Sequence, residues 1–109
     1  MSEHLVVLTT VSRAEDAERI ARALVERRLA ACVNVVPGLT SFYRFKGKLE
    51  RDDERLLLIK TRGDRFGPLR DALAELHPNE LPEIVAVPLA AGSAASWEWL
   101  DASLSDPGS

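Results

Sequence analysis

A long run of strand-forming residues constrains this sequence more than any other feature. From residue 33 to residue 45, β-branched, aromatic and apolar residues continue with a break only at Pro37-Gly38. Strands usually have about five to six residues, so this run predicts an unusually long strand. Lys46-Gly47-Lys48 supplies a turn, and after a polar stretch at 50–55 the segment 56–61 predicts the returning strand. We expect a hairpin of this length to contact another subunit.

The first part of the chain predicts a strand followed by a helix. Residues 5–11 form a short, almost continuously apolar run, typical of a strand covered on at least one face. Ser12 and Glu15 have the spacing of a capping box, which predicts the start of a helix. Apolar residues then recur at helical spacing: Ala14, Ala17, Ile20, Ala21, Leu24 and Val25. We expect this helix to end near Leu29.

The second half predicts another helix and strand. The helix starts between Asp64 and Pro68, and it must end by His77 because Pro78 disfavours helical geometry in the residue before it. Residues 82–89 are mostly apolar with prolines near both ends, which predicts a fourth strand.

A last helix and a tail complete the chain. Gly92-Ser93 opens the helix, which has Trp97, Leu100 and Leu104 along one stripe. Residues 105–109 are predicted to form a flexible tail. We interpret residues 1–104 as a single domain, because 109 residues with 46% hydrophobic and 28% charged side chains are typical of one folded domain.

The order of these elements predicts an α+β fold. Strand, helix, strand, strand, helix, strand is the ferredoxin-like, or split βαβ, arrangement, with an antiparallel sheet, an extended β hairpin and an added C-terminal helix. Both main helices then lie on one face of the sheet. Segments 56–59 and 84–87 are apolar on both faces, so the other face needs a cover. We expect a homo-oligomer to supply it; the alternative is that the hairpin bends at Pro37-Gly38 and covers its own sheet.

Charge and cysteine content exclude several classes of protein. The formal net charge of -3 and the pI near 5.4 argue against nucleic acid or an anionic membrane surface as a partner. No apolar run approaches the roughly 18 residues of a membrane span. Cys32 is the only cysteine and has apolar neighbours, which is typical of a small buried side chain in a reducing compartment. We expect a cytoplasmic protein.

Several blocks along nearly the whole chain resemble the CutA divalent-cation-tolerance family. The blocks are 31–34, 37–50, 58–61, His77-Pro78, 82–84 and Trp99-Leu100. The resemblance implies a ferredoxin-like subunit in a tight homotrimer, with long hairpins that cross between subunits. It also implies a role in tolerance of, or response to, divalent cations, with copper or another divalent cation as the bound ion.

The sequence departs from the family pattern in three places. Phe45 and Asn79 stand where the family usually has Trp and Tyr, so the indole and phenol hydrogen bonds are lost. Some bacterial members have a Cys in the first strand and a second His beside the first, where this chain has Thr9 and Leu76. These last departures weaken the case for a metal site.

Charged and aromatic residues suggest a cleft between subunits. Lys60 ends an apolar strand segment and needs a carboxylate if it is partly buried, so we expect a pair with Glu83, with Tyr43 and Arg44 nearby. The alternative is a solvated hairpin with alternating charges. Trp97 and Trp99 are about 200° apart around a helix, so they cannot both face the core. One of them can pack across an interface or line the cleft.

The metal candidates are His77 and Glu80, with Glu83 nearby in sequence. An imidazole and carboxylates suit copper or zinc. The alternative is that His77 caps the helix that precedes Pro78. Cys32 is a candidate thiolate ligand but is better explained as a buried apolar side chain. We expect His4, close to the amino terminus, to be solvated.

Three functional hypotheses remain at this level. The first is a trimeric cation-tolerance protein. The second is a trimeric scaffold or signalling module that binds a small molecule or a partner and has no intrinsic metal function. The third is an enzyme, which we do not favour because the sequence has no Ser/His/Asp arrangement, Gly-rich phosphate loop or Cys/His pair.

Overall fold

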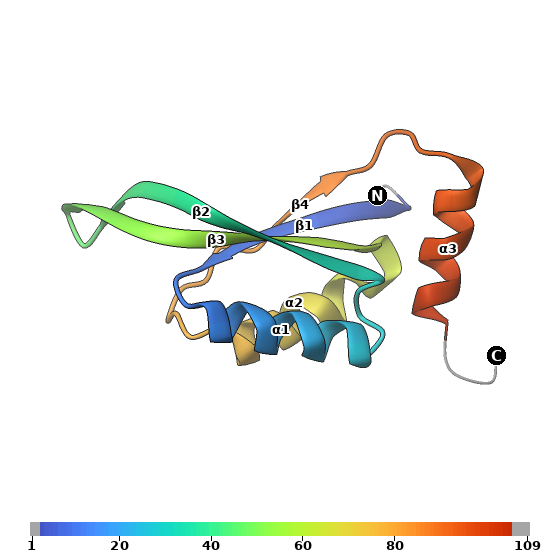
Figure 1. Cartoon of the computed structure of the whole chain (residues 1–109), viewed down its shortest axis with the longest axis horizontal. Helices are drawn as coiled ribbons and strands as arrows, with labels where there is room; N and C mark the ends of the chain where they lie inside the picture. Colours follow the sequence, from blue (N-terminus) through green and yellow to red (C-terminus); the bar gives the residue numbers. More distant parts are fainter. Residues whose placement is uncertain (1–2, 106–109) are drawn as a thin grey trace.

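The computed structural model of the chain describes residues 3–105, and in them four strands form one sheet with three α-helices (Figure 1). The elements are β1 (His4–Val11), α1 (Ala14–Glu26), β2 (Cys32–Phe45), β3 (Lys48–Arg62), the short 3-10 helix η1 (Gly63–Arg65), α2 (Phe66–Leu76), β4 (Val85–Pro88) and α3 (Ala94–Leu104). The strand order is β2-β3-β1-β4, and each neighbouring pair is antiparallel. This confirms the predicted α+β class with an antiparallel sheet and an added C-terminal helix.

The hairpin of β2 and β3 is longer than predicted. Its turn has two residues, Lys46 and Gly47, with φ of 50° and 79°, and Phe45 pairs with Lys48. Two left-handed residues in a two-residue loop match the twist of a hairpin, which is why glycine is favoured in it. The prediction that the polar stretch 50–55 only leads into a strand was wrong, because residues 50–54 pair with residues 39–43 of β2 and Arg55 pairs with Val11 of β1. The charged side chains fit there because this part of the hairpin is largely exposed.

The break at Pro37-Gly38 is a bulge in β2. Val36 pairs with Leu56 and Leu39 pairs with Glu54, so two residues of β2 lie opposite one residue of β3. Gly38 has a φ of 81°, which a glycine adopts without the strain that a Cβ would cause. Beyond the bulge the hairpin extends away from its own sheet and does not fold over it (Figure 1).

The main core lies between the sheet and the helix pair α1 and α2, which cover the same face (Figure 1). Its largest members come from β1, β3 and both helices: Val7, Val11, Ile20, Leu24, Leu57, Ile59, Leu69 and Leu73. A second, smaller cluster joins Ala31 to Leu100 and Leu104 of α3, with Trp97 against it. Helix α3 is therefore attached at one end of the sheet and does not form part of the main layer.

The predicted limits of α2 are correct, whereas the predicted N-terminal cap of α1 is not. The capping box was wrong: the N-cap of α1 is Arg13, and the Glu15 carboxylate accepts hydrogen bonds from the Arg13 guanidinium. Helix α2 begins at Phe66 and ends at Leu76, within the predicted limits. Ser93 caps α3, because its hydroxyl accepts a hydrogen bond of 3.1 Å from the Ser96 amide.

Strand β4 is shorter than the predicted strand at 82–89. Only Val85–Pro88 pairs with β1 in the described structure, opposite residues 5–8. The predicted flexible tail lies outside the described residues except for Ser105, which follows α3. None of the helices in residues 3–105 is long and apolar enough to cross a membrane.

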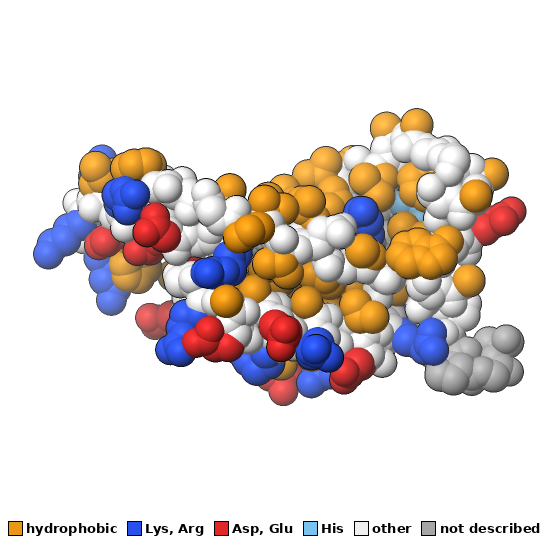
Figure 2. All heavy atoms as spheres, in the orientation of Figure 1, with side chains coloured by type: hydrophobic (Ala, Val, Ile, Leu, Met, Phe, Trp, Pro, Cys, Tyr) orange, Lys and Arg blue, Asp and Glu red, His pale blue; other side chains and the backbone are white. Residues whose placement is uncertain are grey.

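The face of the sheet opposite α1 and α2 is largely uncovered. We call it the open face, and its residues follow from the strand register: Val6, Leu8, Thr10, Cys32, Asn34, Val36, Leu56, Leu58, Lys60, Val85 and Val87. Val85 and Val87 are each 45% exposed. Figure 2 shows hydrophobic side chains gathered across the middle of the molecule, with charged side chains at the hairpin end and over the helices.

Candidate functional site

Two hollows lie along the described surface, and together they contain most of the predicted site residues. The larger has a volume of about 710 Å³, and we call it the acidic hollow. Its functional groups come from the hairpin and from the segment before β4: Tyr43, Arg44, Asp52, Glu54, Glu80 and Glu83. The smaller has a volume of about 490 Å³, and we call it the tryptophan hollow because Lys60, Trp97 and Trp99 line it.

The acidic hollow is built on the outer half of the hairpin. The Tyr43 hydroxyl donates a hydrogen bond to the Asp52 carboxylate on the neighbouring strand. This hydrogen bond, together with the nearby negative charges, raises the pKa of Tyr43 to about 12, because loss of the phenol proton would place two anions side by side. Tyr43 is therefore a neutral donor over the physiological range.

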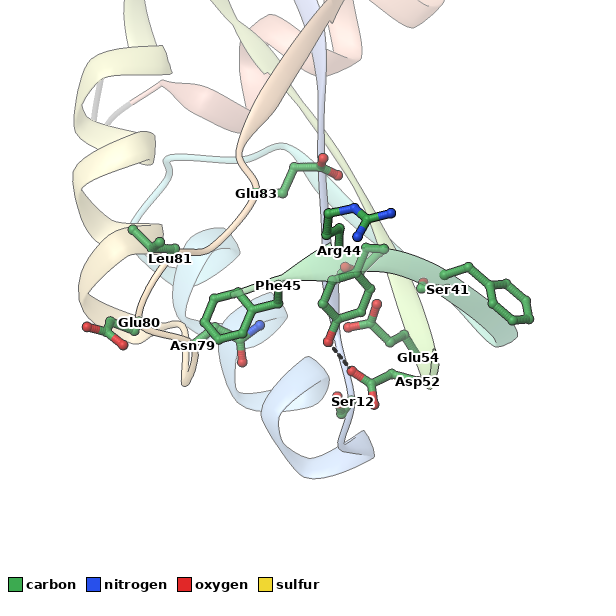
Figure 3. Close-up of a pocket in the computed structure, with 13 residues that line it drawn as sticks. Ser12, Ser41, Arg44, Phe45, Asp52, Glu54, Asn79, Glu80, Leu81 and Glu83 are labelled. Atoms are coloured by element: carbon green, nitrogen blue, oxygen red, sulfur yellow. Dashed lines mark hydrogen bonds between the residues drawn. The ribbon is translucent and has the colours of Figure 1, made fainter. Parts of the chain in front are cut away.

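Glu54 is the buried carboxylate of this hollow. It is 8% exposed and forms no ion pair within residues 3–105, but its oxygens are not among the buried polar atoms that lack a partner, so water still reaches them. In Figure 3, Glu54 and Asp52 project from β3, and Glu83 projects from the segment before β4. Arg44 contributes a guanidinium whose described polar contact is a long 3.5 Å hydrogen bond to the Gly47 carbonyl. Carboxylates thus outnumber cations in the hollow.

The tryptophan hollow lies between the sheet and α3. Trp97 is partly buried and Trp99 is 53% exposed, which confirms that the two indoles do not both face the core. Trp97 fits closely over Gly92: a Cβ on this glycine would lie 2.5 Å from a ring carbon. Lys60 lines the same hollow from β3.

The predicted cleft residues are therefore divided between two sites. Tyr43, Arg44 and Glu83 share the acidic hollow, whereas Lys60, Trp97 and Trp99 share the tryptophan hollow. No ion pair joins Lys60 to Glu83 within the described part of one chain. The pair was predicted between subunits, so it stays a prediction.

His77 is tied into the fold by both ring nitrogens. It is 6% exposed; its Nε2 lies 2.8 Å from the Thr10 carbonyl oxygen, and its Nδ1 accepts a hydrogen bond of 3.1 Å from the Asn79 amide. These partners require Nε2 to carry the proton. An ion at His77 would have to displace one of these hydrogen bonds. Glu80 is exposed at the rim of the acidic hollow.

His4 is buried, so the prediction that it is solvated was wrong. Its ring stacks on Trp97 with centroids 4.3 Å apart, and Nε2 lies 3.0 Å from Asp101 Oδ1. The burial arises because α3 covers this end of β1. The sequence does carry a signal: Trp97 and Asp101 are four residues apart in a helix, so they lie on one face and can hold a third side chain.

Glu3, His4 and Asp101 form a candidate metal centre. Each offers a ligand atom, and these three atoms lie within 4.8 Å of one another. Within residues 3–105, this is the group of His, Cys, Asp or Glu side chains that is close enough to share a metal ion. The hydrogen bonds from His4 and then from Arg62 lower the pKa of Asp101, so its carboxylate is ionised at neutral pH. Arg62 Nη1 lies 3.3 Å from Asp101 Oδ1, while Nε and Nη2 of the same guanidinium donate to Asp64, so a bound ion would have to share Asp101 with a guanidinium.

Cys32 occupies the open face beside Lys60, its partner across the strands. It is partly exposed, and its thiol lies 3.5 Å from the Asn34 side-chain oxygen. The expectation of a fully buried cysteine was therefore wrong for the single chain.

Comparison with known proteins gives a consistent result over nearly the whole chain. A family model described as "CutA1 divalent ion tolerance protein" matches residues 5–103. The divalent-cation tolerance protein CutA of Thermus thermophilus is 54% identical over 95 residues, which cover 87% of this chain and 92% of that protein. The chloroplastic protein CutA of Arabidopsis thaliana is 42% identical over 96 residues, which cover 88% of this chain and 53% of that protein. The chain thus spans about half the length of the plant relative.

Solved structures agree with this similarity. CutA from Xylella fastidiosa superposes with a TM-score of 0.92 at 38% identity, over 95% of this chain and 100% of that one. The CutA of Archaeoglobus fulgidus, described as a periplasmic divalent cation tolerance protein, gives a TM-score of 0.90 at 36% identity, over 94% and 99% of the two chains. The Thermus and Archaeoglobus proteins are named for divalent cation tolerance, and the names place the Arabidopsis protein in the chloroplast and the Archaeoglobus protein in the periplasm.

Proposed function

The chain belongs to the CutA1 divalent ion tolerance family, and from this premise we propose that it is a homotrimeric divalent-cation tolerance protein that binds copper or another divalent cation. Each subunit has a ferredoxin-like fold in this proposal, and the protein acts in the cytoplasm. The bound cation, the trimer and the compartment are the parts of the proposal that go beyond family membership.

The open face supports the homotrimer. Its apolar side chains lie on four strands, yet in the described chain only α3 covers one end of it. Burial of apolar surface contributes about 25 cal/mol per Å², so covering this face with other subunits stabilises the fold. The hairpin projects far enough beyond its own sheet to reach a neighbouring subunit, since the molecule measures 48 Å along its longest axis and 26 and 23 Å across (Figure 1).

One observation carries the proposal of a bound cation: the convergence of Glu3, His4 and Asp101. One imidazole and two carboxylates form a donor set that suits zinc or copper, and copper binds most tightly among the first-row divalent ions. The predicted ligands His77 and Glu80 are less suitable, because both His77 nitrogens already have partners.

Calorimetric titration with copper and zinc in a buffer that does not chelate them tests this assignment. We expect Asp101→Asn to weaken copper binding by at least about tenfold, because metal ligands and their immediate partners contribute at this level. His77→Gln is the matched control, since His77 is the other histidine of the chain, and it should bind copper like the wild type. Equal binding by wild type and Asp101→Asn would exclude this centre, and loss of binding in His77→Gln alone would move the site to His77.

The alternative is a trimeric scaffold or signalling module that binds a small molecule. The acidic hollow favours it, because Tyr43, Arg44 and Glu83 place a neutral donor, a cation and an anion around one space of about 710 Å³. A thermal-shift screen with metabolites in the presence of a chelator discriminates between the two. A specific ligand raises the unfolding midpoint without metal, whereas a protein that responds only to cations shows a shift after metal is added.

A further inference from the structure

Lys60 is the cation in the uncovered part of the open face; Arg62, two residues further along β3, is ion-paired with Asp64 and Asp101. The direct neighbours of Lys60 across the strands are Val6 and Cys32, and the next open-face residue along β3 is Leu58. In residues 3–105 its ammonium group has no ion pair and no side-chain hydrogen bond. If a second subunit covers the open face, it removes this ammonium from water. The covering subunit must then supply a carboxylate, because a buried unpaired charge is strongly unfavourable.

Glu54 is a carboxylate on the same side of β3 as Lys60, beyond the bulge and toward the hairpin. It is the carboxylate among the buried residues of the described chain, at 8% exposure, and it has no partner there. It lines the acidic hollow together with Asp52, which already accepts the hydrogen bond from Tyr43. The hollow is wide enough to admit a side chain from outside, at about 710 Å³.

These two groups cannot satisfy each other within one chain. Both belong to β3, and residues 54 and 60 are six positions apart in an extended strand. At about 3.3 Å per residue, they are separated by roughly 20 Å. This side of β3 therefore carries an anion toward the hairpin and a cation toward α3, with the apolar open-face residues Leu56 and Leu58 between them.

We propose that Lys60 of one subunit enters the acidic hollow of its neighbour and pairs with Glu54 there. This inference rests on the proposed trimer and adds the contact that sets its register. A surface with complementary ends favours head-to-tail packing, in which each subunit gives one cation and receives another, and such packing forms a ring where the rotation between subunits closes after three copies. Each acidic hollow is then completed by a residue of the partner.

Glu83 lines the same hollow and is the partner that the sequence suggested for Lys60. Glu83 is exposed in the single chain, whereas Glu54 is only 8% exposed, so a covering subunit would remove the little water that still reaches the Glu54 carboxylate. The need for a cation is therefore greater at Glu54, and we assign the pair to it.

Charge reversal tests the pair by sedimentation velocity over a dilution series, with circular dichroism to check folding. Lys60→Glu and Glu54→Lys should each raise the subunit dissociation constant by at least about a hundredfold, since breaking a buried pair is strongly destabilising. The double reversal should recover most of this loss. Glu80→Lys, an exposed change at the same hollow, is the matched control and should assemble like the wild type.

If single reversals do not fold, the neutral variants Lys60→Met and Glu54→Gln provide the same comparison. Each alone should weaken assembly, and the two together should assemble more tightly than the weaker single variant. A wild type that sediments as a monomer would overturn the proposed trimer. A trimeric wild type whose single reversals assemble normally would overturn the pair alone. Equal losses in Glu54→Lys and Glu83→Lys, or no recovery in the double reversal, would overturn the assignment to Glu54.

Discussion

At the scale of single residues, the position and burial of several candidate site residues depend on hydrogen bonds to other elements and not on residue type alone. His4 and His77 are the two histidines of the chain, and both are buried with polar partners on other elements. The sequence predicted that His77 has a fixed position at the end of a helix, because it precedes Pro78. The burial of His4 was not predicted, because it depends on where α3 packs against β1.

Tyr43 provides a clean test at this scale because it is the only tyrosine in the chain. Absorbance titration of the phenolate should give a pKa of about 12, and Asp52→Asn should lower it toward the usual value of about 10. The folded-state pKa lies above the unfolded one, so this contribution to stability is complete below pH 10 and is lost as the pH rises from 10 to 12.

The control for this titration is Asp53→Asn, which changes the neighbouring exposed carboxylate that pairs with Arg51. It should leave the phenol pKa within a few tenths of the wild-type value. An identical titration of Tyr43 in wild type and Asp52→Asn would show that the hydrogen bond does not form in solution.

At the scale of elements, α3 is held to the rest of the chain by a small apolar cluster and a few specific polar contacts. The Arg28 and Arg65 guanidinium groups donate hydrogen bonds to the carbonyls of Ser103 and Leu104. Trp97 packs over Gly92 at the start of this unit, where a Cβ has no room. The position of α3 therefore depends on the absence of a side chain at one residue.

Substitution of two glycines should have opposite effects on stability. Gly92→Ala places a Cβ 2.5 Å from the Trp97 ring, and we expect it to lower the free energy of unfolding by about 1–3 kcal/mol. Gly67→Ala is the control: it lies in α2 with no atom within 4 Å of the added Cβ, and it should raise that free energy by up to about 1 kcal/mol.

Urea unfolding of both variants at one fixed protein concentration measures these effects, since the stability of an oligomer depends on concentration. A Gly92→Ala protein as stable as the wild type would mean that Trp97 moves without cost and that α3 is not held as described.

The sequence predicted elements well where local chemistry determines them. The long β2 strand, its irregularity at Pro37-Gly38 and the end of α2 before Pro78 all follow from residue geometry. The prediction failed at residues 50–55, because their strand conformation comes from pairing with β2 and not from their own preference. The capping box failed for a similar reason: Glu15 pairs with Arg13, and this competing contact is invisible in the spacing alone.

For the candidate site, the sequence identified the residues but not their grouping. It paired Lys60 with Glu83 in a cleft between subunits; within one chain the two residues line different hollows, and the pair stays a prediction. It missed Glu54, because a charged residue in a charged segment gives no sign that it will be buried. Burial at this position comes from the twist of the hairpin against the segment before β4, which is a property of the tertiary structure.

At the scale of the whole molecule, the two faces of the sheet differ in how much of their apolar surface is covered. Helices α1 and α2 bury most of one face, where Val35 is still 40% exposed, whereas Val36, Val85 and Val87 on the open face all remain 37–45% exposed. A fold whose net stability is only about 5–15 kcal/mol gains substantially from covering such a surface. The hairpin, the open face and the separated charges of Glu54 and Lys60 all have a consistent explanation in a ring of identical subunits.

The mass of the protein in solution tests this account most directly. Sedimentation equilibrium at micromolar concentration, without added metal, should give three times the 12.0 kDa mass of one chain. A mass of 12.0 kDa over the whole concentration range would contradict the account, because the open face would then be exposed to water in the stable protein.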